Sequence, residues 1–208
     1  MDKDNRIQIA IITVLALIIV SFVLYVAKEN FQSIKPAGIN NNTATTEVKQ
    51  DAKNLPAPFS FKETTIIPLR NFCITGKILS RKRYRSGKEA KISPIDFAMG
   101  WGAMADEKVL RSIRISQSNR WYYWRTKQFP IPRREIETHS ANMHIIPADD
   151  IMSKKVLKAK KGEIVKISGY LVRVIGNNNW TWQSSLTRND TGNHACEVIF
   201  VKDFEILD

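Results

Sequence analysis

An uninterrupted apolar run near the N-terminus constrains this chain most. Residues 7–27, IQIAIITVLALIIVSFVLYVA, contain no charged side chain. As a helix at about 1.5 Å per residue, this run extends about 31 Å, the thickness of a bilayer's hydrocarbon core. Lipid offers no partners to backbone amides, so such a segment is expected to span a membrane as a helix. A buried core helix of a soluble domain would show a polar stripe, which this run lacks.

The flanks of the run predict how it is processed and oriented. Residues 1–6 form a short tail of mixed charge. The apolar run is longer than the roughly 7–15 residues of a signal peptide, so we expect it to be retained rather than cleaved. The two flanks hold equal numbers of Lys and Arg residues, so the additional positive charge of the N-terminal α-amino group favours residues 1–6 on the cytoplasmic side. The C-terminal domain is therefore expected on the opposite, outer side of the membrane.

The next segment has the composition of a linker. Residues 28–58 are rich in Asn, Thr and Ala, contain three prolines and show no sustained periodicity. Residues 59–208 form the predicted domain and hold 26 Lys and Arg against 15 Asp and Glu. This positive surplus favours a polyanionic partner, such as nucleic acid, anionic lipid or an acidic glycan.

The predicted domain reads mainly as strands. Leu69–Lys82 and Glu163–Ile175 alternate between apolar and polar residues, and Ile115–Lys127 is rich in aromatic residues without a helical period. Two or three short helices are expected between the strands, at 106–113, at 133–138 and after Ala148. This order predicts a small β-barrel, with an α+β sheet domain as the alternative.

Two short strand patterns resemble those of OB-folds. Phe72–Ile78 is similar to an OB-type first strand, and Gly162–Tyr170 is similar to the strand that follows the OB helix. The expected fold is therefore an N-terminal transmembrane helix joined to a mainly-β, OB-like barrel.

Four motifs are spread over most of residues 70–205. They are Ile95–Gly102, Arg120–Arg125, Ser140–His144 and Trp182–Arg188. Through these motifs the chain resembles an uncharacterised family of bacterial single-pass membrane proteins. No established activity follows from that resemblance, but it implies a bacterial envelope location, with the helix in the inner membrane and the C-terminal domain in the periplasm.

Two pairs of residues are candidates for nucleophilic catalysis. His194 and Cys196 would share a face if they lie in a strand. Ser140 and His144 are four residues apart and would be neighbours on a helix. Ser140 also weakly resembles the serine of membrane-anchored signal peptidases, which need a lysine base, and Lys166 is the candidate. Neither pair has an identifiable third group that would orient it, and an N-cap role for Ser140 is the plainer interpretation.

No metal or cofactor is expected. His139 and His144 are five residues apart rather than the four of a helical zinc pair, and no Cys-x-x-Cys motif exists. Cys73 and Cys196 are a candidate disulfide in an oxidising compartment and two buried thiols otherwise.

Basic residues interleaved with aromatic ones give the stronger prediction. Trp121, Tyr123 and Arg125 would share one face of a strand, while Arg120, Tyr122 and Trp124 would share the other. Exposed rings beside arginines can stack on bases or sugars, although large rings also fill cores. The predicted binding residues are Arg120, Trp121, Tyr122, Trp124, Arg125, Trp180, Trp182 and Arg188.

Three functions remain open from the sequence. The preferred one is a membrane-anchored envelope module, non-enzymatic, that binds a protein partner or a polyanion through its β domain. The second is an OB-like module for single-stranded nucleic acid. The third is a Cys- or Ser-dependent hydrolase.

Overall fold

The computed structural model describes Ser21 and residues 46–190, 192 and 195–207. The chain divides into two units, residues 1–43 and 44–208. All the strands and helices reported below belong to the second unit.

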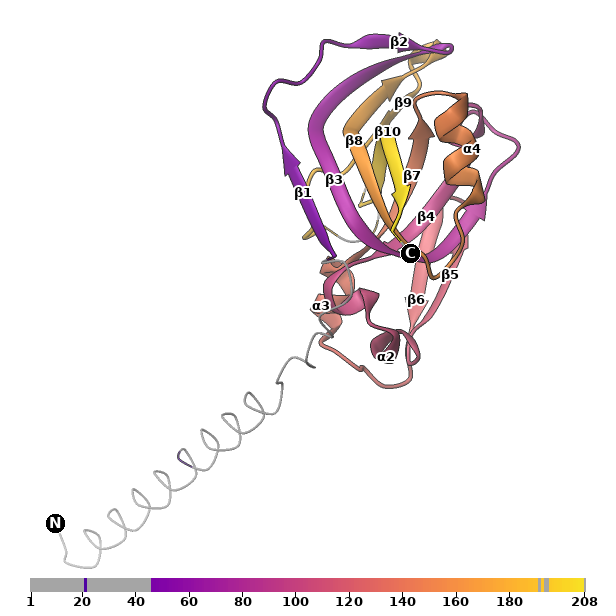
Figure 1. Ribbon diagram of the computed structural model, residues 1–208. Helices are drawn as coiled ribbons and strands as arrows, with labels where there is room; N and C mark the ends of the chain where they lie inside the picture. Colours follow the sequence, from indigo (N-terminus) through magenta and orange to yellow (C-terminus); the bar gives the residue numbers. More distant parts are fainter. Residues whose placement is uncertain (1–20, 22–45, 191, 193–194, 208) are drawn as a thin grey trace, which may run out of the picture. The chain divides into compact units, whose positions relative to one another are not determined.

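Eight strands of this unit form one sheet that closes on itself (Figure 1). Its longest strand, β3 (Thr64–Arg83), pairs antiparallel with both β4 (Ile95–Gly100) and β8 (Ile164–Ile175). From β4 the order continues through β7 (Ser140–Pro147) and β10 (Glu197–Ile206) back to β8. The β7–β10 pair is parallel, and the other pairs of this ring are antiparallel. Register shifts along β3 are of the kind that bends a strand strongly enough to close a sheet.

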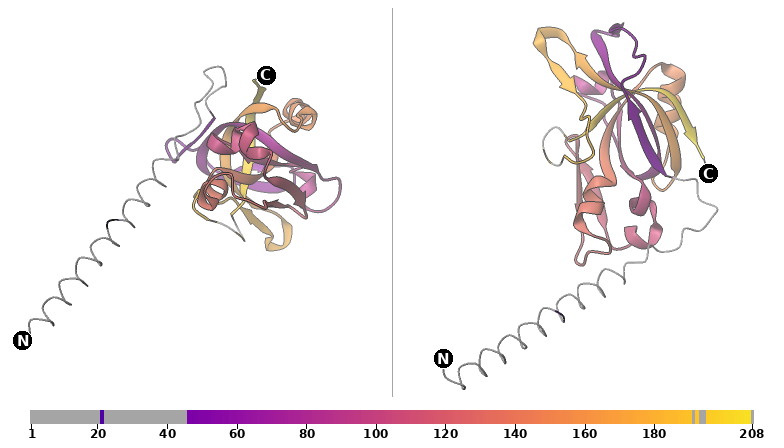
Figure 2. Two further views of the ribbon diagram at one scale, coloured as in Figure 1. Left: turned by 90° about the horizontal axis from the view of Figure 1, so that it is seen from below. Right: turned by 90° about the vertical axis from the view of Figure 1, so that its left-hand side faces the viewer.

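Shorter elements extend the ring. The strands β1 (Glu47–Asp51) and β2 (Phe59–Phe61) pair with β3, and β9 (Thr181–Gln183) pairs with β8. Figure 2 (right) shows β1 running alongside β3. The connections include α4 (Asp150–Lys158), which follows β7, and the short helical turns η1 (Glu89–Lys91) and η3 (Asn177–Asn179).

The core fills the ring because its strands alternate. Successive side chains of a strand point to opposite faces. The inward positions of β4 and β7 carry Phe97, Met99, Met143 and Ile145, all fully buried. The outward positions hold a mixture of polar and apolar residues, so that face needs a separate cover. They include Asp96 and Ala98 of β4 and Ser140, Asn142, His144 and Ile146 of β7.

Residues 101–139, inserted between β4 and β7, provide that cover. Tyr122 and Trp124 of this insert pack on a small apolar cluster with Ala98 of β4. The insert contains η2 (Gly102–Ala105), α2 (Glu107–Leu110), β5 (Arg114–Ser118), β6 (Trp121–Arg125) and α3 (Arg133–Thr138). The strands β5 and β6 form a separate two-stranded sheet.

The predicted fold class, a transmembrane helix joined to an OB-like barrel with an α+β domain as alternative, is wrong. The predicted span, residues 7–27, lies outside the described residues apart from Ser21, and no helix in the described part is long and apolar enough to cross a membrane. The longest described helix, α4, has nine residues and is about 14 Å long, less than half the hydrocarbon thickness. The structure supports a mainly-β domain with one eight-stranded sheet, whose closure is compatible with a β-barrel.

Two local predictions need correction. Ile115–Lys127 is not one strand but a hairpin of β5 and β6, because Asn119 and Arg120 turn the chain between them. Ser140–His144 is not helical but begins β7. The predicted domain boundaries and the inner-membrane location remain predictions, although Glu47–Asp51 of the expected linker forms β1.

Candidate functional site

A cleft of about 600 Å³ lies where the insert meets the closed sheet. The edge of β6 forms one wall, and α3 forms another. The loop before β10 forms the third wall, and the first residues of β7 form the floor. Arg134 Nη2 joins two walls by donating to the main-chain oxygen of Asn189 over 3.1 Å. The cleft is lined by Trp121–Thr126, Phe129, Arg133, Glu137, Thr138, Ser140–Asn142, Arg188, Asp190, Gly192, Ala195 and Cys196.

The turn at the tip of the hairpin sets which face each ring takes. Asn119 and Arg120 both have positive φ, +51° and +66°, which is the backbone of a two-residue type I′ hairpin turn. The strand that follows exposes Trp121 and Tyr123, which are 38% and 51% exposed. Tyr122 and Trp124 point the other way and are half-buried.

Arg120, predicted to bind a ligand, instead anchors the hairpin tip to the closed sheet. Its Nη1 donates to the buried carboxylate of Asp96 over 2.6 Å, and its Nη2 donates to the main-chain oxygen of Ser93 over 2.9 Å. Its guanidinium lies 3.8 Å from the ring centroid of Tyr84. With these contacts, Arg120 is a structural residue that holds β6 in place.

Three more predicted residues pack near Arg120 and do not line the cleft. The ring of Trp182 lies 4.6 Å from that of His144 and 6.1 Å from that of Trp180. His144 Nδ1 lies 3.0 Å from Asp96 Oδ1. This aromatic and charged group supports the outer face of the sheet rather than the cleft.

Ser140 lies in the cleft floor, and none of its hydrogen-bond partners among the described residues is a base. Its hydroxyl donates to the main-chain oxygen of Ile136 over 2.6 Å, so it accepts from the Tyr122 hydroxyl, 2.5 Å away. Burial raises the pKa of Tyr122 to about 12, which keeps it a proton donor. His144 is four residues along the same strand, about 13 Å away at about 3.3 Å per residue, so the predicted Ser140–His144 pair does not form.

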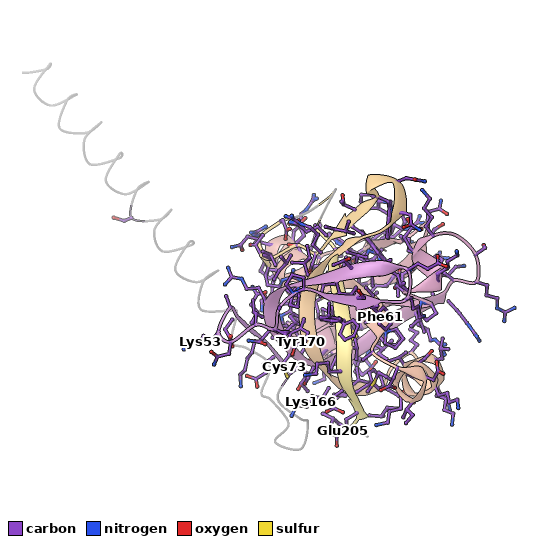
Figure 3. The ribbon with its side chains drawn as sticks, turned by 90° about the horizontal axis from the view of Figure 1, so that it is seen from above. Lys53, Phe61, Cys73, Lys166, Tyr170 and Glu205 are labelled. Carbon is purple, nitrogen blue, oxygen red and sulfur yellow. The ribbon has the colours of Figure 1, made fainter. Side chains whose placement is uncertain are left out.

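Lys166, the candidate base for Ser140, lies elsewhere. It is an exposed residue of β8, opposite Thr75 and Glu205 in the pairing register, and it does not line the cleft. Figure 3 shows it on the same side of the molecule as Glu205 and Cys73.

Cys196 lines the cleft but is a weak nucleophile. Burial raises the pKa of its thiol to about 11, so the thiol stays protonated at neutral pH. Its predicted partner His194 lies outside the described residues. Cys73 and Cys196, the candidate disulfide, are both free thiols in the structure, and Cys73 accepts a hydrogen bond from Ser168.

The arginines of the site differ in their partners. Arg188 pairs with the fully buried carboxylate of Glu197, and burial lowers the pKa of Arg188 to about 10. Arg133 pairs with Glu137 over 2.8 Å.

Arg125 lies directly opposite Arg114 in the hairpin register, and both are exposed with no ion-pair partner among the described residues. Two like charges opposed across strands repel each other unless an anion lies between them.

The described residues contain no group of three His, Cys, Asp or Glu side chains placed to hold a metal ion. No protein-family model, curated protein or solved structure matches this chain. The resemblance to a family of bacterial single-pass membrane proteins therefore stays a prediction, as do the absence of a cofactor and the proposed partners.

The structure adds three residues to the site that the sequence analysis did not select. Tyr123 and Phe129 are half exposed, and both line the cleft. Asn142 joins floor and hairpin: its Nδ2 donates to the main-chain oxygen of Arg120, and its Oδ1 accepts from Gln117. Tyr123 carried a usable signal, since it shares a face with Trp121 and Arg125, whereas Asn142 acts through a contact between distant segments.

Proposed function

We propose that this domain is a non-enzymatic binding module that holds an extended, acidic segment of a partner protein in the cleft beside β6. One observation carries the proposal: a cleft walled by five aromatic side chains also includes Arg125, which lies opposite Arg114 in the hairpin register. Neither arginine has an ion-pair partner among the described residues. Aromatic walls with a few polar groups are typical of recognition sites. A carboxylate placed between the two arginines would relieve their repulsion.

The other two functions have less support. OB modules bind nucleic acid across the outer face of neighbouring strands and their loops. Here the insert covers the outer face of β4 and β7. The exposed rings of Trp121 and Tyr123 can stack on bases, so binding of single-stranded nucleic acid is measured beside binding of the peptide. Hydrolysis has the weakest support, because no described base bonds to Ser140 and Cys196 is held as a thiol.

The test uses the full-length chain and a capped ten-residue peptide that alternates glutamate and valine, (Glu-Val)5. Isothermal titration calorimetry is expected to detect binding of this peptide and none of (Lys-Val)5. The Arg125→Glu variant is expected to weaken binding about tenfold or more, since charged hydrogen bonds contribute about 1.5–3 kcal/mol.

Lys154→Glu is the matched control, because it makes the same charge change on exposed α4, outside the lining of the cleft. Its affinity should stay within about twofold of the parent chain, as expected for a remote surface charge. The proposal fails if (Glu-Val)5 does not bind at 1 mM, or if the oligonucleotide dT12 binds more tightly and with the same dependence on Arg125.

A further inference from the structure

The edge of β6 that faces away from β5 carries main-chain groups without hydrogen-bond partners among the described residues. In a two-residue hairpin the residues flanking the turn, here Ser118 and Trp121, form a hydrogen-bonded pair, and such pairs then alternate with non-bonded ones. Tyr122 and Trp124 occupy the non-bonded positions, opposite Gln117 and Ile115. Their N–H and C=O groups therefore point outward, away from β5.

Nothing described in the chain satisfies these four groups. The main-chain hydrogen bonds between segments include none to Tyr122 or Trp124. The side-chain bonds of both residues involve only the Tyr122 hydroxyl, which contacts Ser140, and ring contacts of Trp124. Unpaired groups along a strand edge form a template for another strand.

The lining of the cleft shows that this edge faces it. Six consecutive residues, Trp121–Thr126, line the cleft. Neighbouring residues of a strand point to opposite faces, so one face alone would contribute every second residue. Continuous lining means that the strand borders the cleft with its edge.

From these observations we propose that the partner segment binds by strand addition to β6. Its main chain would bond the N–H and C=O groups of Tyr122 and Trp124, which is the β-augmentation mode of peptide recognition. This inference rests on the proposed function and specifies how the acidic segment is held.

The flanking side chains define the sequence of the added strand. Alternate residues would continue the outer face of the hairpin, where Trp121, Tyr123 and Arg125 are exposed. The residues between them would face the cleft floor, which includes Ala141. The partner is therefore a segment in which acidic and apolar residues alternate, as in (Glu-Val)5.

Backbone methylation of the peptide tests the pairing. Two versions of (Glu-Val)5 are compared by calorimetry with the full-length chain, one N-methylated at every valine and one at every glutamate. An added strand presents alternate amides to β6, so methylating one set should weaken binding at least about tenfold, and methylating the other should leave it within about threefold.

Amide hydrogen exchange of the protein gives a second readout. The amides of Tyr122 and Trp124 should become protected when the unmethylated peptide binds, whereas the amide of Tyr123, already bonded to β5, should not change.

The outcomes separate this inference from the proposed function. If both methylated peptides bind equally, or if Tyr122 and Trp124 gain no protection, strand addition is refuted while binding of the acidic peptide stands. If the unmethylated peptide does not bind, the proposed function fails and the strand-addition mode fails with it. Preferential binding of dT12 would likewise refute both.

Discussion

The contact between Arg120 and Asp96 makes a quantitative prediction about stability. Arg120→Ala removes one partner of an ion pair in which the Asp96 carboxylate is fully buried and the arginine side chain is 18% exposed. Leaving a buried charge unpaired costs about 3–5 kcal/mol. For a domain of this size, about 2–4 °C of Tm follows each kcal/mol, so we expect Tm to fall by about 6–20 °C.

Arg120→Lys should not restore stability. The guanidinium uses its fork, with Nη1 on Asp96 and Nη2 on the main-chain oxygen of Ser93. An ammonium group is a single point charge and does not reproduce that geometry. Arg125→Ala is the control, because Arg125 is exposed and unpaired, and its removal should change the free energy of unfolding by less than about 0.5 kcal/mol.

Thermal unfolding followed by circular dichroism measures these values, and a double-mutant cycle with Asp96→Ala isolates the pair. The double variant should be less destabilised than the sum of the two single variants, because it leaves no unpaired charge. A loss below about 1 kcal/mol in Arg120→Ala, or simple additivity in the cycle, would refute the view that this pair anchors the hairpin.

Three further predictions concern single side chains. In the Cys73→Ser variant, iodoacetamide should label Cys196 about 100-fold more slowly at pH 8 than a thiol with pKa 9.0, and ordinary labelling would contradict its raised pKa of about 11. The free energy of unfolding should also fall as pH rises from about 9 to 11, because the thiol of the unfolded chain loses its proton first. Tyr122→Phe should lower the free energy of unfolding by about 1 kcal/mol through loss of its bond to Ser140, measured by urea denaturation, and no change would show that the bond contributes nothing. Gly169→Ala should fail to fold or lose several kcal/mol, because the new Cβ would lie 1.9 Å from the main-chain oxygen of Phe200, and a parent-like Tm would contradict this packing.

Local signals predicted several elements well. The alternation of Glu163–Ile175 corresponds to β8, and the predicted helix at 133–138 is α3. The helix expected after Ala148 is α4, and Asp149 caps it, since its side chain accepts from the main-chain nitrogen of Met152. Each of these signals depends only on neighbours in the sequence.

Elements set by distant contacts were missed. In β7, Ser140, Asn142 and His144 alternate with apolar residues, yet Ser140 and His144 alone, four residues apart, also fit one face of a helix, and both faces of this strand are buried. The β5–β6 turn has no glycine, and Arg120 is a rare residue at positive φ. Its conformation is held by Asp96, Ser93 and Tyr84, which lie 24 or more residues away in the chain. No local pattern reveals such a dependence.

The predicted binding residues divided for the same reason. Trp121, Tyr122, Trp124 and Arg125 are consecutive or nearly so, and one strand brings them to one cleft. Arg188 is distant in the sequence but lines the same cleft. The side chains of Arg120, Trp180 and Trp182 instead contact other residues of the domain and do not line the cleft. The sequence shows that aromatic residues and arginines are abundant. Whether each of these side chains is exposed depends on the residues that pack against it in the fold.

The topology explains why a ligand site would lie on the insert rather than on the ring of strands. Each strand of the closed ring, β3, β4, β7, β10 and β8, is paired on both sides, so the ring itself offers no free edge. Among the described strands of this sheet, the short β1, β2 and β9 pair on one side each. The insert covers the outer face of β4 and β7 and so removes that surface from recognition. The same insert forms a two-stranded sheet, and its strand β6 brings a free edge to the cleft. The segment that covers one surface therefore also provides a strand edge at which main-chain recognition is possible.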